Sequence, residues 1–189
     1  MRYLLSFVLP FLLIIELFAQ ETTAGKGFAS VDFKRSSVQG NTAYIFGARG
    51  GWPLSQSFSL GLAGYWAHVN DPVTNIENNQ DYYVRMAYGG LYLEYKLYRF
   101  NFGCIQISTL VGGGYYGHSV VKSDYEIDWT RYFYFVFEPE AIVMFDISDS
   151  FKTGIGVSYR SIPNVELNDY ENSKLCAPAV LLTFRFVID

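Results

Sequence analysis

Residues 133–145 read FYFVFEPEAIVMF, and the alternation in this stretch constrains the fold more than any other feature. Phe137 and Pro139 fall on one face of an extended strand, whereas Glu138 and Glu140 fall on the other. One face is apolar and the other acidic, so the two faces must meet different environments. Because proline cannot donate a backbone hydrogen bond to a neighbouring strand, we expect a bulge or an unpaired carbonyl beside it.

The first residues have the features of a secretory signal. Arg2 precedes an apolar run over residues 3–15, and Ala19 is a small residue where a signal peptidase would cut. The apolar run is too short for a membrane-spanning helix. We therefore expect residues 1–19 to be a cleaved signal peptide and residues 20–189 to form one exported domain.

The composition excludes several classes of protein. The chain has 14 Lys+Arg and 18 Asp+Glu, and a net charge of −4 gives no basic surface for nucleic acid. Two cysteines are too few for a disulfide scaffold. Cys104 and Cys176 fall at opposite ends of their predicted strands, so we predict two free thiols. The 19% aromatic content, together with 17 glycines, favours β structure over a helical bundle.

Alternation and aromatic content predict eight strands. They cover residues 27–36, 42–53, 57–68, 82–98, 101–117, 132–147, 151–161 and 176–188. Short connections such as PLSQ, YRFN and SDS alternate with longer polar ones such as HVNDPVTNIENNQD, HSVVKSDYEIDWT and SIPNVELNDYENSK. This rhythm is typical of an antiparallel up-and-down barrel with one smooth end and one end that carries long loops.

The charged faces of the strands point into the predicted barrel and the apolar faces point out. Aromatic residues bracket the apolar faces eight positions apart, as in the pairs Tyr44 with Trp52 and Phe151 with Tyr159. At ~3.3 Å per residue and a tilt of ~40°, this spacing is roughly 20 Å along the barrel axis. That height suits the apolar band of a membrane barrel with its aromatic girdles. The alternative, a soluble lipocalin-like barrel, would place the charged faces outside.

An interior ion-pair network is the predicted role of the inward charges, because charges inside a membrane protein pair with one another. We expect Glu138 or Glu140 to contact Arg49 or Arg160. Alternation also points Asp32, Lys34 and Asp146 inward. The predicted network consists of Arg49, Glu94, Lys96, Glu138, Glu140, Lys152, Arg160 and Arg185.

The chain resembles the small eight-stranded outer-membrane β-barrels, which are broadly OmpA/OmpX-like. It resembles more closely a group of uncharacterised barrel proteins of Bacteroidota-type bacteria. The resemblance rests on the order and spacing of GARGGW (47–52), FSLGLAGY (58–65), YGGLYLEY (88–95), FEPEA (137–141) and GIGVSYR (154–160). It implies that residues 20–189 form a transmembrane β-barrel in the bacterial outer membrane. The ending FRFVID departs from the terminal aromatic residue common in such barrels.

No residue pattern predicts a catalytic, cofactor or metal site. The two histidines, His68 and His118, are predicted to point to opposite sides of the wall, and two ligands are too few for zinc. An alternative is an enzyme that modifies lipid A at the outer rim, with His118, Ser119 and Asp124 as base, nucleophile and orienting group. A narrow pore is a second alternative.

The expected function is a structural or interaction role through the extracellular loops of a monomer with a plugged interior. The expected partners are outer-membrane lipid and lipopolysaccharide, the outer-membrane assembly machinery and an unknown extracellular ligand, with no nucleic acid. An acidic outer rim could hold divalent cations. The acidic residues predicted for this rim are Asp71, Glu77, Asp81, Asp124, Glu126, Asp128, Glu166, Asp169 and Glu171.

Overall fold

The computed structural model describes residues 26–38, 40–69, 73–75, 80–121, 127–163 and 175–188. The predicted signal peptide, residues 1–19, lies outside the described residues and remains a prediction. Within these ranges there is no helix that is long and apolar enough to cross a membrane.

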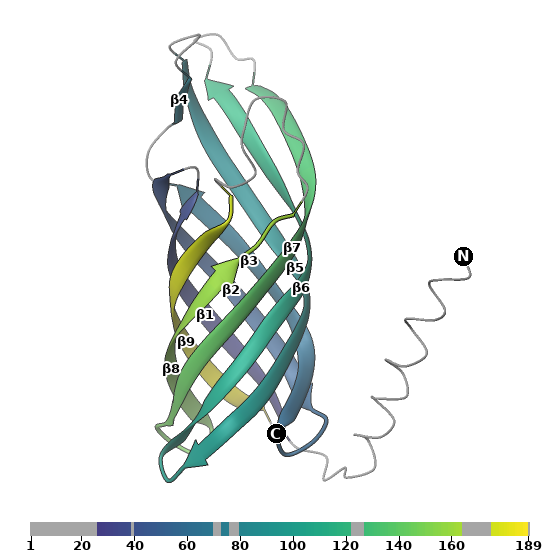
Figure 1. Ribbon diagram of the computed structural model, residues 1–189, viewed down its shortest axis with the longest axis vertical. Helices are drawn as coiled ribbons and strands as arrows, with labels where there is room; N and C mark the ends of the chain where they lie inside the picture. The colour runs from purple at the N-terminus through teal and green to yellow at the C-terminus, as the bar shows by residue number, and fades with distance from the viewer. Residues whose placement is uncertain are drawn as a thin grey trace, which may run out of the picture.

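Eight long antiparallel strands form a closed barrel (Figure 1). The strands are β1 (Gly27–Val38), β2 (Asn41–Pro53), β3 (Phe58–Val69), β5 (Gln80–Phe100), β6 (Gly103–Val121), β7 (Ile127–Asp146), β8 (Phe151–Arg160) and β9 (Ala177–Ile188). Each long strand pairs with the next one in sequence, and β1 pairs with β9 to close the barrel. The predicted all-β, eight-stranded up-and-down barrel is confirmed.

The short connections and both described chain ends lie at the same end of the barrel. The turns 54–57, 101–102 and 147–150 join β2 to β3, β5 to β6 and β7 to β8. Gly27 of β1 pairs with Ile188 of β9 at this end, which is the lower end in Figure 1. In outer-membrane barrels the short turns are periplasmic, so we call this the periplasmic end and the opposite one the outer end.

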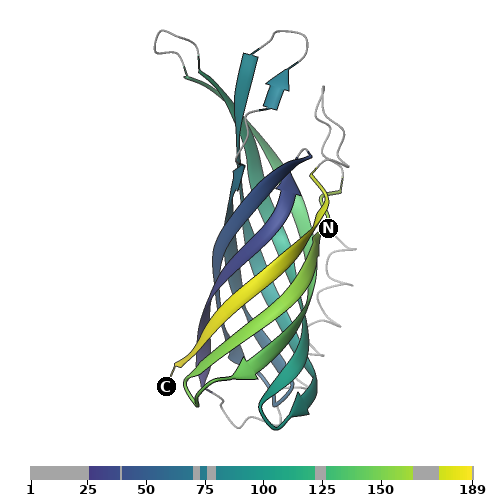
Figure 2. The same cartoon turned by 90° about the vertical axis from the view of Figure 1, so that its left-hand side faces the viewer.

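Three strands continue beyond the others at the outer end. β5, β6 and β7 rise above the rim in Figures 1 and 2, and the short strand β4 (Val73–Asn75) pairs with the start of β5. The segments 69–81 and 118–130 were therefore wrongly predicted as loops throughout. Strand-forming residues such as Val120 and Ile127 extend the β6–β7 hairpin into the second segment. Asp81 and Asp128 accordingly lie in β5 and β7, whereas the other seven predicted rim acids lie outside the described residues.

The ladder between β7 and β8 is interrupted at Pro139. It runs from Asp146 to Glu140 and resumes only at the isolated pair Phe137 with Ser161, in the same register. No residue is inserted, so the predicted bulge is absent. Because Pro139 has no N–H, the carbonyl of Tyr159 opposite receives no ladder hydrogen bond from it. An unpaired carbonyl was the other of the two outcomes expected from the sequence. The pairing of Pro139 with Thr109 of β6 is continuous.

The apolar faces point outward and the charged faces inward, as predicted. Leu62 is 65% exposed and Trp52 is 68% exposed, whereas Glu138 and Arg49 are at most 2% exposed. The aromatic residues of the predicted girdles, including Tyr44, lie on the outer face. The interior is not uniformly polar, however. Apolar and aromatic side chains fill much of its outer half, and they include Ile45, Met86, Tyr116, Tyr134 and Val136.

Candidate functional site

Glu140 lies at the centre of a buried ion-pair network inside the barrel. One carboxylate oxygen lies 2.6 Å from Nζ of Lys34, and the other lies 2.6 Å from Nη1 of Arg49. The hydroxyl of Ser108 also donates to Glu140, at 3.0 Å. These residues come from β1, β2, β6 and β7, so the network ties the walls of the barrel together across its interior.

Glu138 shares Lys34 with Glu140. Its Oε1 accepts from the Lys34 ammonium at 2.9 Å and from the Ser158 hydroxyl at 2.7 Å. Lys34 therefore bridges the two carboxylates of the FEPEA stretch, and all three side chains are buried. Both carboxylates are held by cations away from solvent, which explains how an apolar strand accommodates two acids.

Tyrosine side chains complete the network around the two cations. The hydroxyl of Tyr65 donates to Asp32 at 2.8 Å, and Asp32 lies 3.1 Å from Nε of Arg49. Nη1 of Arg49 donates to the hydroxyl of Tyr92 at 2.9 Å. Nζ of Lys34 lies 3.8 Å from the ring centroid of Tyr65, within the range of a cation–π interaction.

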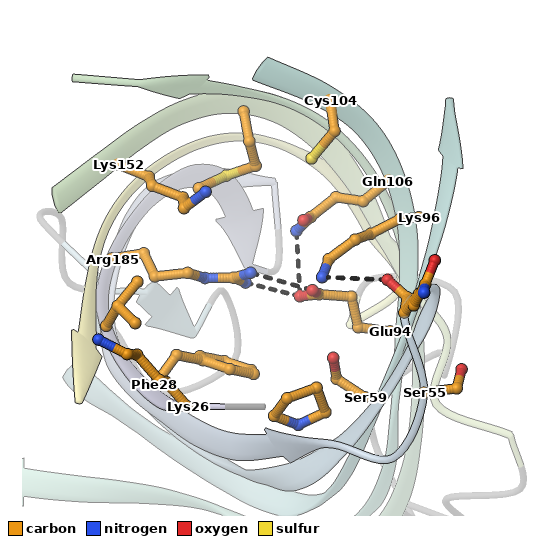
Figure 3. Close-up of a pocket in the computed structure, with 14 residues that line it drawn as sticks. Lys26, Phe28, Ser55, Ser59, Glu94, Lys96, Cys104, Gln106, Lys152 and Arg185 are labelled. Carbon is orange, nitrogen blue, oxygen red and sulfur yellow. Dashed lines mark hydrogen bonds and ion pairs between the residues drawn. The ribbon is translucent and has the colours of Figure 1, made fainter. Parts of the chain in front are cut away.

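A second buried pair lies nearer the periplasmic end. Arg185 of β9 meets Glu94 of β5 with two parallel contacts of 2.9 and 2.6 Å (Figure 3). Gln106 and Tyr92 donate to the same carboxylate at 3.2 and 2.9 Å. The guanidinium of Arg185 lies 4.1 Å from the ring centroid of Phe28. A forked contact of this kind fixes both orientation and distance across the barrel.

The predicted network is not complete in the structure. Arg160 donates to the carbonyls of Leu175 and Ser37 at 3.0 and 2.8 Å, and in the described part of the chain it pairs with no carboxylate. Lys152 forms a separate, half-exposed pair of 2.6 Å with Asp146. The prediction that Glu138 or Glu140 contacts Arg49 or Arg160 is confirmed by the pair of Arg49 with Glu140. Arg160 itself is buried but is held by these two backbone carbonyls instead of by an acid.

Lys96 belongs to the predicted network but makes no ion pair with a described acid. Its nearest polar contact is the carbonyl of Gln56 at 3.5 Å, and among the described residues no carboxylate forms an ion pair with it. Its side chain points into a cavity of about 400 Å³ at the periplasmic end (Figure 3). The cavity is bounded on the interior side by the pair of Glu94 with Arg185.

Sequence reasoning placed Lys34 and Asp32 on the inward face but did not include them in the network. It also placed Tyr92 on the inward face, but gave no tyrosine a part in the network. Tyr65 and Tyr92 occupy inward positions of β3 and β5, in alternation with outward residues. The inward positions of these tyrosines were the available signal, because the hydroxyl of a buried tyrosine must find a partner.

Histidine and cysteine residues form no site in the described ranges. His68 lies exposed on the outer face, as predicted, and the side chain of His118 lies outside the described residues. No group of three or more potential metal ligands occurs among the residues described. Cys104 and Cys176 are both free thiols, which confirms the prediction from their positions.

The exterior is that of a membrane-spanning barrel. Large apolar side chains cover the outer face over every long strand, and lipid cannot satisfy a free strand edge, so only a closed sheet suits such a surface. The exposed residues include Phe33, Phe46, Leu62, Leu91, Ile107, Phe135, Val157 and Leu182.

Comparisons with known proteins agree on the fold. Neisserial surface protein A matches with a TM-score of 0.61 at 9% identity, over 86% of this chain and 96% of that chain. The N-terminal β-barrel domain of OprF from Pseudomonas aeruginosa matches with a TM-score of 0.50 at 12% identity, over 86% of this chain and 98% of that chain. The chain has the fold of the small eight-stranded outer-membrane β-barrels.

Sequence comparisons add no narrower assignment. No protein-family model matches the chain, and no curated protein matches its sequence. The closer resemblance to barrel proteins of Bacteroidota-type bacteria therefore remains a prediction from the motifs.

Proposed function

We propose that the chain is a small integral protein of the bacterial outer membrane, with a side-chain-plugged interior and an interaction role on the cell surface. The observation that carries this proposal is the pair of contacts between opposite walls. Arg49 reaches Glu140, and Arg185 reaches Glu94, in each case between strands four positions apart around the eight-stranded barrel. Two such contacts across the interior leave little room for a continuous aqueous path.

The balance of the buried charges supports a plug. Among the described residues, four buried acids face four buried cations. These are Asp32, Glu94, Glu138 and Glu140, with Lys34, Arg49, Arg160 and Arg185. Ion-selective pores are lined by rings of one sign, which attract the permeant ion. An eight-stranded barrel is also just wide enough for its own side chains to fill.

The surface available for interaction is the outer extension of β5, β6 and β7, together with the segments that connect the strands there. The outer ends of β5, β6 and β7 project beyond the rim of the barrel (Figure 2). Binding residues concentrate on connecting segments that a rigid scaffold positions. We propose lipopolysaccharide and an extracellular ligand as the partners at this end, and insertion of a monomer by the outer-membrane assembly machinery. Divalent cations bound to rim acids remain part of this proposal.

Cell fractionation with heat-modifiable gel mobility tests the location and the barrel together. We expect the protein in the outer-membrane fraction, with a folded band that migrates differently from the boiled one. Planar-bilayer recording of the purified barrel tests the plug, and we expect no discrete conductance steps. Conductance steps of constant size from the folded protein would instead show that the interior is a narrow pore.

The remaining alternative is an enzyme that modifies lipid A. Mass spectrometry of lipid A from cells with and without the gene addresses it directly. We expect identical spectra. A mass difference that is lost when His118 is substituted would favour an enzyme over an interaction protein.

A further inference from the structure

The periplasmic cavity differs in charge from the rest of the interior. We call it the vestibule, and it is lined by four cationic side chains, Lys26, Lys96, Lys152 and Arg185, against the single carboxylate of Glu94. Arg185 is neutralised by its forked contact with Glu94, and Lys152 by Asp146. Among the described residues that line this mouth, Lys96 is therefore the cation to consider, because no ion pair with a carboxylate is formed by it.

Lys96 contributes the uncompensated charge. Its side chain is half-buried, and its ammonium has only the carbonyl of Gln56 within reach, at 3.5 Å. A carbonyl carries no net charge, and among the described residues no carboxylate lies within ion-pair distance of this ammonium. The neighbouring Glu94 is engaged by Arg185. A partly desolvated ammonium is costly without one. An anion that enters the vestibule would therefore find a charge with no ion-pair partner among the described residues.

A β-bulge creates the space in front of Lys96. The register of β5 against β6 shifts between Lys96 and Tyr98, so that Leu97 is the additional residue. Regular alternation would place Tyr98 opposite Cys104, which lines the vestibule. With the bulge, Tyr98 pairs instead with Ile105 and is 64% exposed on the outer face. Bulges commonly re-aim side chains at binding sites, and this one keeps a bulky ring out of the vestibule.

The size and the donors suit a phosphate group. A volume of about 400 Å³ lies within the range of small-ligand pockets, which is roughly 300–1,000 Å³. The one guanidinium in the lining is committed to Glu94, so the groups that remain are ammoniums. Lysine ammoniums bind phosphate oxygens as point charges, without the fork geometry of a guanidinium.

We propose that the vestibule is an anion-binding site that takes a phosphate group at the periplasmic face, with Lys96 as its principal ligand and Lys152 as a weaker second one, because Lys152 also pairs with Asp146. Two sources carry this chemistry. One is a small phosphate dissolved in the periplasm, and the other is the headgroup of an anionic phospholipid of the inner leaflet. This inference is independent of the proposed surface role, because it concerns the opposite end of the barrel.

The first arm of the test uses the whole refolded barrel in nanodiscs of phosphatidylcholine, with inorganic phosphate as the probe. Saturable line broadening in ³¹P spectra is the expected result. Lys96→Gln should weaken this binding about tenfold, the effect of losing one half-buried charge contact. Asp146→Asn should strengthen it several-fold, because it releases Lys152. Arg35→Gln removes an equal charge from an exposed position at the outer end and should change nothing.

The second arm replaces part of the phosphatidylcholine by phosphatidylglycerol and measures retention of that lipid during exchange. The site is assigned to a lipid headgroup if the variants change lipid retention in the order expected above and inorganic phosphate does not bind. Phosphate binding without lipid retention assigns it to a soluble anion. Binding that is absent in both arms, or equal in the wild type, Lys96→Gln and Asp146→Asn, would overturn the proposal. Heat-modifiable mobility confirms that each variant is folded, and Lys96→Arg should retain binding.

Discussion

Arg49 on β2 and Glu140 on β7 meet at 2.6 Å, although their strands lie on opposite walls of the barrel. The contact therefore spans the whole interior, and it works together with the contact of Lys34 with the same carboxylate. Since these cations are buried, removal of the acid leaves two charges in a medium of low dielectric constant without compensation.

The first prediction follows from this geometry. Glu140→Gln should lower the free energy of unfolding by about 3–5 kcal/mol, the cost of breaking a buried ion pair. Glu138→Gln should cost less, because Lys34 keeps Glu140 as a partner and Glu138 has no contact with Arg49. Urea unfolding in phospholipid vesicles, followed by tryptophan fluorescence, measures both. Equal losses for the two variants would contradict the central role of Glu140.

The pair of Glu94 with Arg185 provides a second prediction. Each single change, Glu94→Met or Arg185→Met, should destabilise the barrel by about 3–5 kcal/mol, since it leaves the buried partner charge without a counter-ion. The double variant should recover most of this loss, because a buried pair can be replaced by apolar residues at little cost. A double-mutant cycle from unfolding curves gives the coupling energy. Additive losses would show that the two residues do not act as a pair.

A third prediction compares two glycines on adjacent strands. A Cβ atom added at Gly47 would collide with the ring of Tyr65, whose hydroxyl binds Asp32. A Cβ atom added at Gly64 would meet no heavy atom within 4 Å. Gly47→Ala should therefore destabilise the barrel by about 1–3 kcal/mol through overpacking. Gly64→Ala serves as the matched control, and it should leave the unfolding midpoint unchanged or raise it slightly.

The strands, their faces and the inward set of charges could be predicted because a period of two fixes which side chains share a face. The choice of partners could not. Arg49 meets Glu140 rather than Glu138 because of the stagger of the strands around the barrel, which no local pattern encodes. The bulge beside Lys96 was equally invisible, since the sequence alternates through residues 91–97 without a break. Arg160 shows a further limit, because a buried cation can donate its hydrogen bonds to backbone carbonyls, which alternation does not reveal.

The last prediction tests which face meets lipid. Leu62 lies near the middle of β3 and is 65% exposed on the outer face. Leu62→Arg should cost about 2–4 kcal/mol if the residue lies near the midplane of the bilayer. Leu62→Phe is the control, because it keeps an apolar side chain on the same face and should be nearly neutral. Both are measured by unfolding in vesicles and then in detergent micelles. The penalty for arginine should shrink in thin or loosely packed micelles, since the guanidinium then reaches water more easily. An arginine variant as stable as the wild type in vesicles would mean that this face does not contact the hydrocarbon core.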